Sequence, residues 1–480
     1  MGKRTLILLD RLHWLWLGLT APFMLLSSPA RSPVMLVVPA LWLLHWLVVR
    51  MQQRDNSSSS SHASRPTPRA SFIPITPLNL VLLIMVLMVL VSEWATFDLI
   101  YSLPKISGMV LGLGIFFALA REGERARGWW WSLVAFLGIG LGVAALGFLG
   151  TDWTTTKIVF LTPIVNRLPK IIAGLQGAES GFHPNEVAGV LLWVLPMLVS
   201  ISAGFLFVSQ GARSLQKGIK TEKANRAGKQ KGLSGWRLVG VIVLCLLALL
   251  FVGAVFVLTQ SRGGYIGLAL ALPLLFLLAL PPKRRWICVG VFVVLAILLG
   301  FVAASHWATI RDWVIGSDMA SDPALSLNTL ASRVEIWSRA IYGIQDFPFT
   351  GMGMNGFRKV MPVLYPVFAL PQDLDIGHAH NEFLQAALDL GIPGLIAFIA
   401  LYINAFWMLF DTWRKGQLQG MVLPYKAILL GLGGGLLAHL LYGLTDAVAL
   451  GAKPGMLFWM LLGLIAGVYE QARTDKGVTA

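Results

Sequence analysis

Long apolar segments recur along the whole 480-residue chain and restrict the folds available to it. A helix needs about 20 predominantly apolar residues to cross a bilayer. Hydrophobic residues make up 56% of the chain and charged residues 13%, a balance foreign to a soluble globular domain. The sequence therefore predicts an all-α polytopic membrane protein with about 12 transmembrane helices. The expected spans are residues 6–26, 33–49, 78–95, 103–120, 129–150, 187–208, 238–259, 265–280, 286–304, 392–410, 427–444 and 455–468.

The basic residues support this number of spans and orient the chain. Cytoplasmic loops carry an excess of Lys and Arg. With the N-terminus inside, alternating spans place most of the 38 basic residues in inner loops. We therefore expect a multi-pass protein of the cell inner (plasma) membrane with both termini cytoplasmic. The net charge of +15 does not indicate nucleic-acid binding, because the basic loop 210–236 lacks interleaved aromatic residues and is better explained by attraction to anionic lipid.

The spans and loops divide the chain into four regions. The first contains about five spans, including a retained first helix, and an inner Ser- and Pro-rich loop at 51–71 that we expect to be mobile. The second contains the central spans and the turn at Arg262. The third is a large extracytoplasmic loop with short helices, and the fourth contains the C-terminal spans. Their predicted ranges are 1–150, 151–304, 305–382 and 383–480.

One segment of the large loop has helical periodicity. Within 331–345, four apolar side chains repeat at the spacing of one helix face. The pattern predicts an amphipathic helix that lies on or near the bilayer. The apolar face would hold Val334, Trp337, Ile341 and Ile344.

The stretch HAHNEFLQAALDLGIPG, from His378 to Gly394, places two histidines beside the start of a span. Histidine is far less costly at a bilayer edge than inside it. A histidine with a pKa near 6.5 accepts a proton at extracytoplasmic pH, so His380 is a natural general base. Histidines at the end of a loop also often have no function, and the remaining motifs decide between these interpretations.

Metal binding is a weaker alternative for the same region. The pair His378 and His380 could indicate zinc, but no third ligand cluster stands out in that loop. Asp373 and Asp375 form a DxD pattern that could hold a divalent cation, although such short acidic patterns are common by chance. We expect a site without metal.

Two arginines stand near the outer boundary. Arg262 precedes Gly263 and Gly264, and glycines allow a backbone to approach a ligand closely. The alternative for Arg262 is an arginine that snorkels to the membrane surface. Arg333 begins the expected amphipathic helix, where pairing with Glu335 at the surface would contribute little. Arginine suits phosphate, because its charge is permanent and its contacts are bidentate.

Four motifs together resemble the O-antigen ligase and polymerase superfamily, integral-membrane glycosyltransferases of the GT-C type. The resemblance covers about residues 150–450, and the HN-x9-GxxG pattern is its most specific part. The N-terminal third is similar only in having generic spans. One departure, His183, puts no catalytic residue in doubt. The motifs are FHPNEVAGVLL (182–192), LTQSRGGY (258–265), RVEIWSRAI with PFTGMGMNGF (333–357) and HNEFLQAALDLGIPG (380–394).

The resemblance implies an activity and a set of roles. A glycan would pass from an undecaprenyl-pyrophosphate donor to an acceptor hydroxyl on the outer face of the inner membrane, in lipopolysaccharide or other polysaccharide biosynthesis. His380 looks like the base that activates the hydroxyl, and Arg262 and Arg333 look like the pair that holds the pyrophosphate. The family's ligases are described as metal-independent and inverting, and no cofactor is implied. The partners would be the lipid-linked donor, a glycan or glycolipid acceptor such as lipid A-core, and membrane lipid.

Five further residues receive supporting roles. His378 and Asn381 are expected to orient His380 or to contact sugar, and Arg339 lies near Arg333 in the same motif. Asn185 is expected to cap a helix that begins near Glu186. Asp446 either meets the acceptor or marks the end of a span.

Two alternative functions remain at this point. A polymerase would use the same donor site with another lipid-linked glycan as acceptor, and the sequence does not separate it from a ligase. A solute transporter, for example for bicarbonate, belongs to a different class. A carrier is expected to hold ionisable groups near mid-membrane, whereas the residues above gather at the outer boundary.

Overall fold

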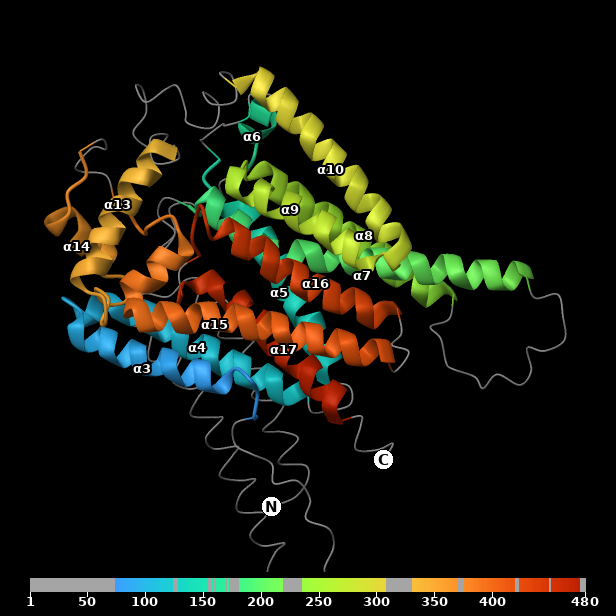
Figure 1. Cartoon of the computed structure of the whole chain (residues 1–480), viewed down its shortest axis with the longest axis horizontal. Coiled ribbons are helices and arrows are strands. Elements are labelled where there is room, and N and C mark those ends of the chain that lie inside the picture. Colours follow the sequence, from blue (N-terminus) through green and yellow to red (C-terminus); the bar gives the residue numbers. More distant parts are fainter. Residues whose placement is uncertain are drawn as a thin grey trace, which may run out of the picture.

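The computed structural model describes most of the chain after residue 73 (Figure 1). The first two expected spans, the loop 51–71 and Asp373 lie outside the described residues. Within the described part, helices form all the regular structure, apart from one isolated β-bridge between Thr151 and Phe182. The described ranges are 74–123, 128–153, 158, 161–169, 171, 181–218, 235–307, 330–368, 375–418, 423–448 and 450–474.

Eight of the described helices are long and apolar enough to cross a membrane. The predicted all-helical, multi-pass membrane fold is therefore confirmed, while the total of about 12 spans and the sidedness stay predictions. Two further helices, α3 (Asn79–Ala95) and α17 (Met456–Thr474), coincide with two other expected spans. The eight are α4 (Leu99–Gly123), α5 (Gly128–Gly150), α7 (Pro184–Gly218), α8 (Gly235–Leu258), α9 (Arg262–Ala279), α10 (Pro282–Ser305), α15 (Glu382–Leu418) and α16 (Leu423–Tyr442).

The core of the bundle lies where α7, α16, α15 and α17 pack together. Helices α7 and α16 approach closely because glycine faces the partner: a Cβ at Gly435 would lie 2.6 Å from the carbonyl oxygen of Trp193. By contrast, α10 leans away from the bundle beside α9 (Figure 1), and none of its most apolar stretch is buried inside the protein. Its apolar side chains suit contact with lipid.

Helix α15 begins ten residues before the predicted span and is broken at Gly391, where φ is 71° and ψ is 177°. Only glycine adopts this backbone readily. The break frees backbone groups, and the segment 348–352 bonds to them: Met352 N donates to Leu388 O (2.7 Å) and Ile392 N donates to Pro348 O (2.7 Å). The PFTGMGMNGF and HN-x9-GxxG motifs therefore meet at one structural feature.

The expected amphipathic helix is present as α13 (Leu330–Asp346). Its protein-facing side is formed by Ile336 and Ala340, both fully buried. Val334 and Ile341, from the predicted apolar face, are 54% and 46% exposed and point away from the protein. Contact of that face with the bilayer stays a prediction. Three shorter elements complete the described structure: α6 (Thr162–Val165), α14 (Phe357–Leu364) and the 3-10 turn η3 (Lys453–Gly455).

Candidate active site

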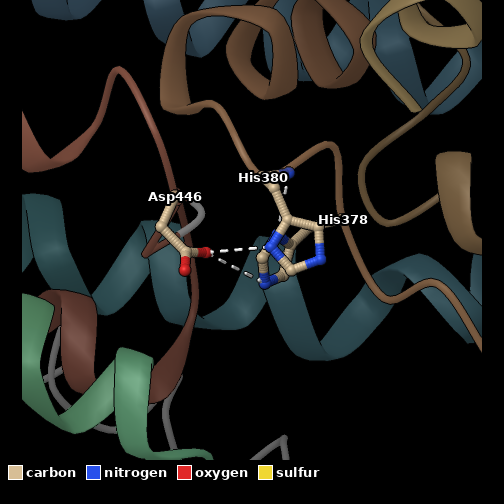
Figure 2. A group of neighbouring side chains, drawn as sticks. All are labelled: His378, His380 and Asp446. Atoms are coloured by element: carbon tan, nitrogen blue, oxygen red, sulfur yellow. Dashed lines mark hydrogen bonds and ion pairs between the residues drawn. The ribbon is translucent and has the colours of Figure 1, made fainter. Parts of the chain in front are cut away.

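Asp446 lies at the centre of a polar cluster at one end of the bundle, four residues after α16 ends. Its Oδ2 accepts hydrogen bonds from Asn185 Nδ2 (2.8 Å) and Arg333 (3.3 Å). Its Oδ1 lies 3.1 Å from Nδ1 of His380 and 4.0 Å from Nε2 of His378 (Figure 2). Three segments that are far apart in the sequence thus converge on the carboxylate of a fourth.

The charge state of Asp446 follows from these neighbours. Burial raises the pKa of the Asp446 carboxyl, but His380, Arg333 and His378 together outweigh burial and hold the pKa well below its ordinary value. The group is therefore a carboxylate, which can only accept hydrogen bonds. His380 must donate from Nδ1, and the lone pair of the neutral ring is then on Nε2.

The backbone at His380 is in the left-handed region, with φ at 46°. For a residue other than glycine this conformation costs on the order of 1–3 kcal/mol and persists only where the surroundings enforce it. Trp337 Nε1 donates to the carbonyl oxygen of His380 (3.3 Å), and the His380 amide donates to Nδ1 of His378 (3.1 Å). These contacts fix the direction in which the imidazole points.

His378 is a neutral neighbour of the base. Burial lowers the pKa of His378 to about 3, and the nearby His380 contributes to the same shift. Because its Nδ1 accepts from the His380 amide, its proton is on Nε2, the atom that faces Asp446. His378 therefore orients His380 through the backbone.

His378, His380 and Asp446 also form a group that could hold a metal ion, since one ligand atom from each lies within 4.8 Å of the others. The third ligand that is missing from the histidine loop is thus supplied by Asp446, 66 residues beyond His380. A metal there would have to displace the Nδ1 proton of His380 and the Nε2 proton of His378. The cluster can hold a proton or a cation between these atoms, but not both.

Arg262 is the first residue of α9, and Ser261 caps the helix by accepting from Gly264 N (3.3 Å). The guanidinium groups of Arg262 and Arg333 lie close enough for their like charges to repel each other. Gly263 serves helix packing here rather than approach to a ligand, because a Cβ would lie 2.5 Å from Oγ1 of Thr445. The glycine thereby brings Arg262 against the turn that contains Asp446.

The expected helix cap at Asn185 is wrong. Helix α7 begins at Pro184, so Asn185 lies within its first turn, and its amide donates to Asp446. The cap signal is local, whereas the observed partner is 261 positions away and is brought there only by tertiary packing. Asn381, by contrast, caps α15: its Oδ1 accepts from Phe383 N and Leu384 N (3.0 Å each).

Two other predicted positions lie apart from the Asp446 cluster. The Arg339 guanidinium pairs with Glu335 (3.3 Å) and donates to the carbonyl of Pro366 (2.9 Å), and these contacts involve neither His380 nor Asp446. Asp375 forms a bidentate pair with Arg358 (Nε to Oδ1, 2.6 Å), and this hydrogen bond lowers the pKa of Asp375. Half of the DxD pattern is therefore already neutralised by an arginine.

Sequence reasoning undervalued several residues. The sequence predicts that Asp446 meets the acceptor or marks the end of a span, and only the tertiary structure shows that His380, Arg333 and Asn185 gather around it. A second buried acid, Asp389, accepts from Gln385 (2.9 Å) and faces Lys105 at 3.8 Å. His439 received no role, yet it is fully buried beside Glu382.

One family model matches part of the chain. No curated protein matches the chain. The family model described as O-antigen ligase matches residues 246–399, a range that contains Arg262, Arg333 and His380. Asn185 and Asp446 lie outside it. The chain is thus a multi-pass membrane protein in which residues 246–399 are similar to the O-antigen ligase family.

Proposed function

We propose that the protein is an O-antigen ligase-like glycosyltransferase. It moves a glycan from undecaprenyl-pyrophosphate to an acceptor hydroxyl on the outer face of the inner membrane, with inversion and without a metal ion. The observation that carries the proposal is the convergence of His380 and Arg333 on the Asp446 carboxylate, with Arg262 at the same corner.

His380 is the general base of this proposal. Asp446 accepts a hydrogen bond from the Nδ1–H group, so the lone pair of Nε2 can take the proton of the acceptor hydroxyl. The imidazolium that results is stabilised by the same carboxylate, as in other histidine–aspartate pairs. A positioned base of this kind contributes on the order of 10²- to 10⁴-fold to the rate.

Arg262 and Arg333 hold the leaving group. The repulsion between these two like charges is unfavourable, and Asp446 pairs with Arg333. A diphosphate would relieve this repulsion and accept bidentate contacts from both. Two guanidinium groups supply the positive charge that a divalent cation provides in other sites.

The reaction is a single displacement. The acceptor oxygen attacks the anomeric carbon, and the bond from that carbon to the pyrophosphate oxygen breaks. The electron pair leaves with the diphosphate, while the hydroxyl proton passes to His380. Attack from the face opposite the leaving group inverts the anomeric centre, and no covalent carboxylate intermediate is needed.

The test uses the purified full chain in lipid nanodiscs with an undecaprenyl-pyrophosphate-linked glycan. Candidate acceptors, including lipid A-core, are added one at a time, and release of undecaprenyl pyrophosphate is measured. His380→Gln should lower the single-turnover rate by about 10²- to 10⁴-fold and leave donor binding nearly unchanged. Thr412→Val is the matched control, because Thr412 is buried in α15 and its hydroxyl donates to the Met408 carbonyl of the same helix.

Retention of near-normal turnover by His380→Gln would reject the assignment of the base. Lengthening of the donor glycan with no separate acceptor would identify the polymerase instead of the ligase. Solute uptake by proteoliposomes that contain no glycan, with no glycan transfer, would support the transporter.

A further inference from the structure

A second histidine–carboxylate pair lies inside the bundle, where the proposed mechanism does not use it. Nε2 of His439, on α16, lies 3.3 Å from Oε1 and 3.2 Å from Oε2 of Glu382, the first residue of α15. Nδ1 of His439 lies 2.9 Å from the carbonyl oxygen of Gly189 on α7. His439 is fully buried and stacks on Trp193, and Glu382 is also buried.

The chemistry of these groups fixes the number of protons in the pair. A carbonyl oxygen can only accept, so Nδ1 of His439 carries a hydrogen directed at Gly189. In the neutral imidazole, Nε2 would then present a lone pair to the carboxylate of Glu382. Two lone pairs at this distance repel, so one proton must lie between His439 and Glu382. The pair is neutral overall, which suits its burial.

The same pair lies next to both the turn that leads to Asp446 and the segment that contains His380. The Glu382 backbone amide donates to the carbonyl oxygen of Gly443 (2.7 Å), and Gly443 begins the turn that leads to Asp446. A Cβ at Gly443 would lie 2.6 Å from Oε2 of Glu382, so the turn packs directly on this side chain. Glu382 also follows the strained backbone of His380 by two residues.

We propose that the Glu382–His439 pair, joined by one shared proton, is a positioning device that holds the strained His380 backbone and the Asp446 turn in register. This inference rests on the proposed function, because it assigns the pair to the placement of the base. Neither side chain contacts the substrate in this proposal. The pair joins α15, α16 and α7. His380 lies just before α15, Asp446 lies just after α16, and Asn185 lies in the first turn of α7.

The decisive comparison is between Glu382→Gln and Glu382→Ala. Glutamine keeps the size of glutamate, and its amide N–H donates to the lone pair on Nε2 of a neutral His439, so the contact survives without the shared proton. Alanine removes the contact. We expect Glu382→Ala to lower the single-turnover transfer rate by about 10- to 100-fold, since a displacement near 1 Å can cost this much. Glu382→Gln should remain within about threefold of the wild type, and donor binding should hold in both.

Hydrogen–deuterium exchange supplies a readout that does not depend on activity. Amides in 378–384 should exchange faster in Glu382→Ala and at the wild-type rate in Glu382→Gln and in the control Thr412→Val. The inference is overturned if Glu382→Ala transfers glycan at the normal rate with His380→Gln inactive, a result that leaves the proposed function intact. It is also overturned if Glu382→Gln is as impaired as Glu382→Ala, or if donor binding falls in step with the rate.

Discussion

Two arginine–aspartate pairs occur in the part of the chain that the structure describes, and their surroundings give them different consequences. In the first, Arg358 binds Asp375 with both guanidinium and carboxylate side chains largely in water, at 42% and 58% exposure. In the second, Arg333 binds Asp446, whose side chain is only 4% exposed and is shared with His380 and Asn185. The first pair is bidentate, and the second has the greater effect on its surroundings.

The difference teaches how burial turns an ion pair into a site. An exposed pair contributes about 0–1 kcal/mol, because water solvates both charges when the pair opens. A buried carboxylate cannot be left unpaired without a large desolvation cost, so each of its partners is held in place. Asp446 thereby sets the tautomer of His380 and the position of Arg333, whereas Asp375 sets only the conformation of Arg358.

The largest effect should come from removing each carboxylate in turn. Asp446→Asn keeps the size of the side chain but loses the charge that fixes the His380 tautomer and balances Arg333. We expect the transfer rate to fall by about 10²- to 10⁴-fold, as for aspartates that orient a catalytic histidine elsewhere. Asp375→Asn should change the rate by less than about threefold, measured in the same nanodisc assay.

A change of less than about threefold in Asp446→Asn as well would remove Asp446 from the mechanism, and equally large losses in both variants would show that burial does not separate the pairs. Circular dichroism of both variants tests whether a difference in rate comes from misfolding.

A smaller effect is expected from exchanging arginine for lysine. Arg262→Lys and Arg333→Lys keep the positive charge but lose the planar, two-pronged contact to phosphate, so donor affinity and rate should fall by about 10- to 100-fold. Arg358→Lys, in the exposed pair, should be nearly neutral. Binding of undecaprenyl pyrophosphate and the initial transfer rate provide the measurements. Near-normal values for both Arg262→Lys and Arg333→Lys would refute the pyrophosphate contact.

We expect removal of divalent cations to leave the transfer rate unchanged. In the proposed mechanism, a proton is held between His380 and Asp446, and the two arginines supply the positive charge at the donor. Transfer in excess chelator should therefore match transfer in added magnesium or zinc. A strict requirement for a cation would instead assign a metal to His378, His380 and Asp446, or to the DxD pattern at Asp373 and Asp375.

Some parts of the site could be read from the sequence because they are local. His380 and Arg262 each stand in a motif near the edge of an apolar run, whose position is a property of about 20 consecutive residues. Arg333 stands at the start of an amphipathic segment, which the spacing of its apolar residues reveals. The glycines of HN-x9-GxxG also indicate an unusual backbone, which is present as the break at Gly391.

Other parts could not be read in this way. Asn185 has the local signature of a helix start, and nothing near it in the sequence points to Asp446. Gly263 and Gly264 suggest a loop close to a ligand, yet Gly263 faces Thr445 across a helix contact. The sequence shows the same glycine whether it lines a ligand site or allows close packing, and only its neighbour in the fold distinguishes these two roles.

The sequence by itself determined that this chain is a helical membrane protein with titratable groups at the edges of its helices. The length of an apolar segment and the spacing of a motif are both properties of consecutive residues. The tertiary structure alone decided that the His380 ring lies against Asp446, that Asn185 and Arg333 share the same carboxylate, and that Glu382 lies beside His439. The physical reason is that a buried polar group must find a partner, and which partner it finds depends on which helix ends pack together.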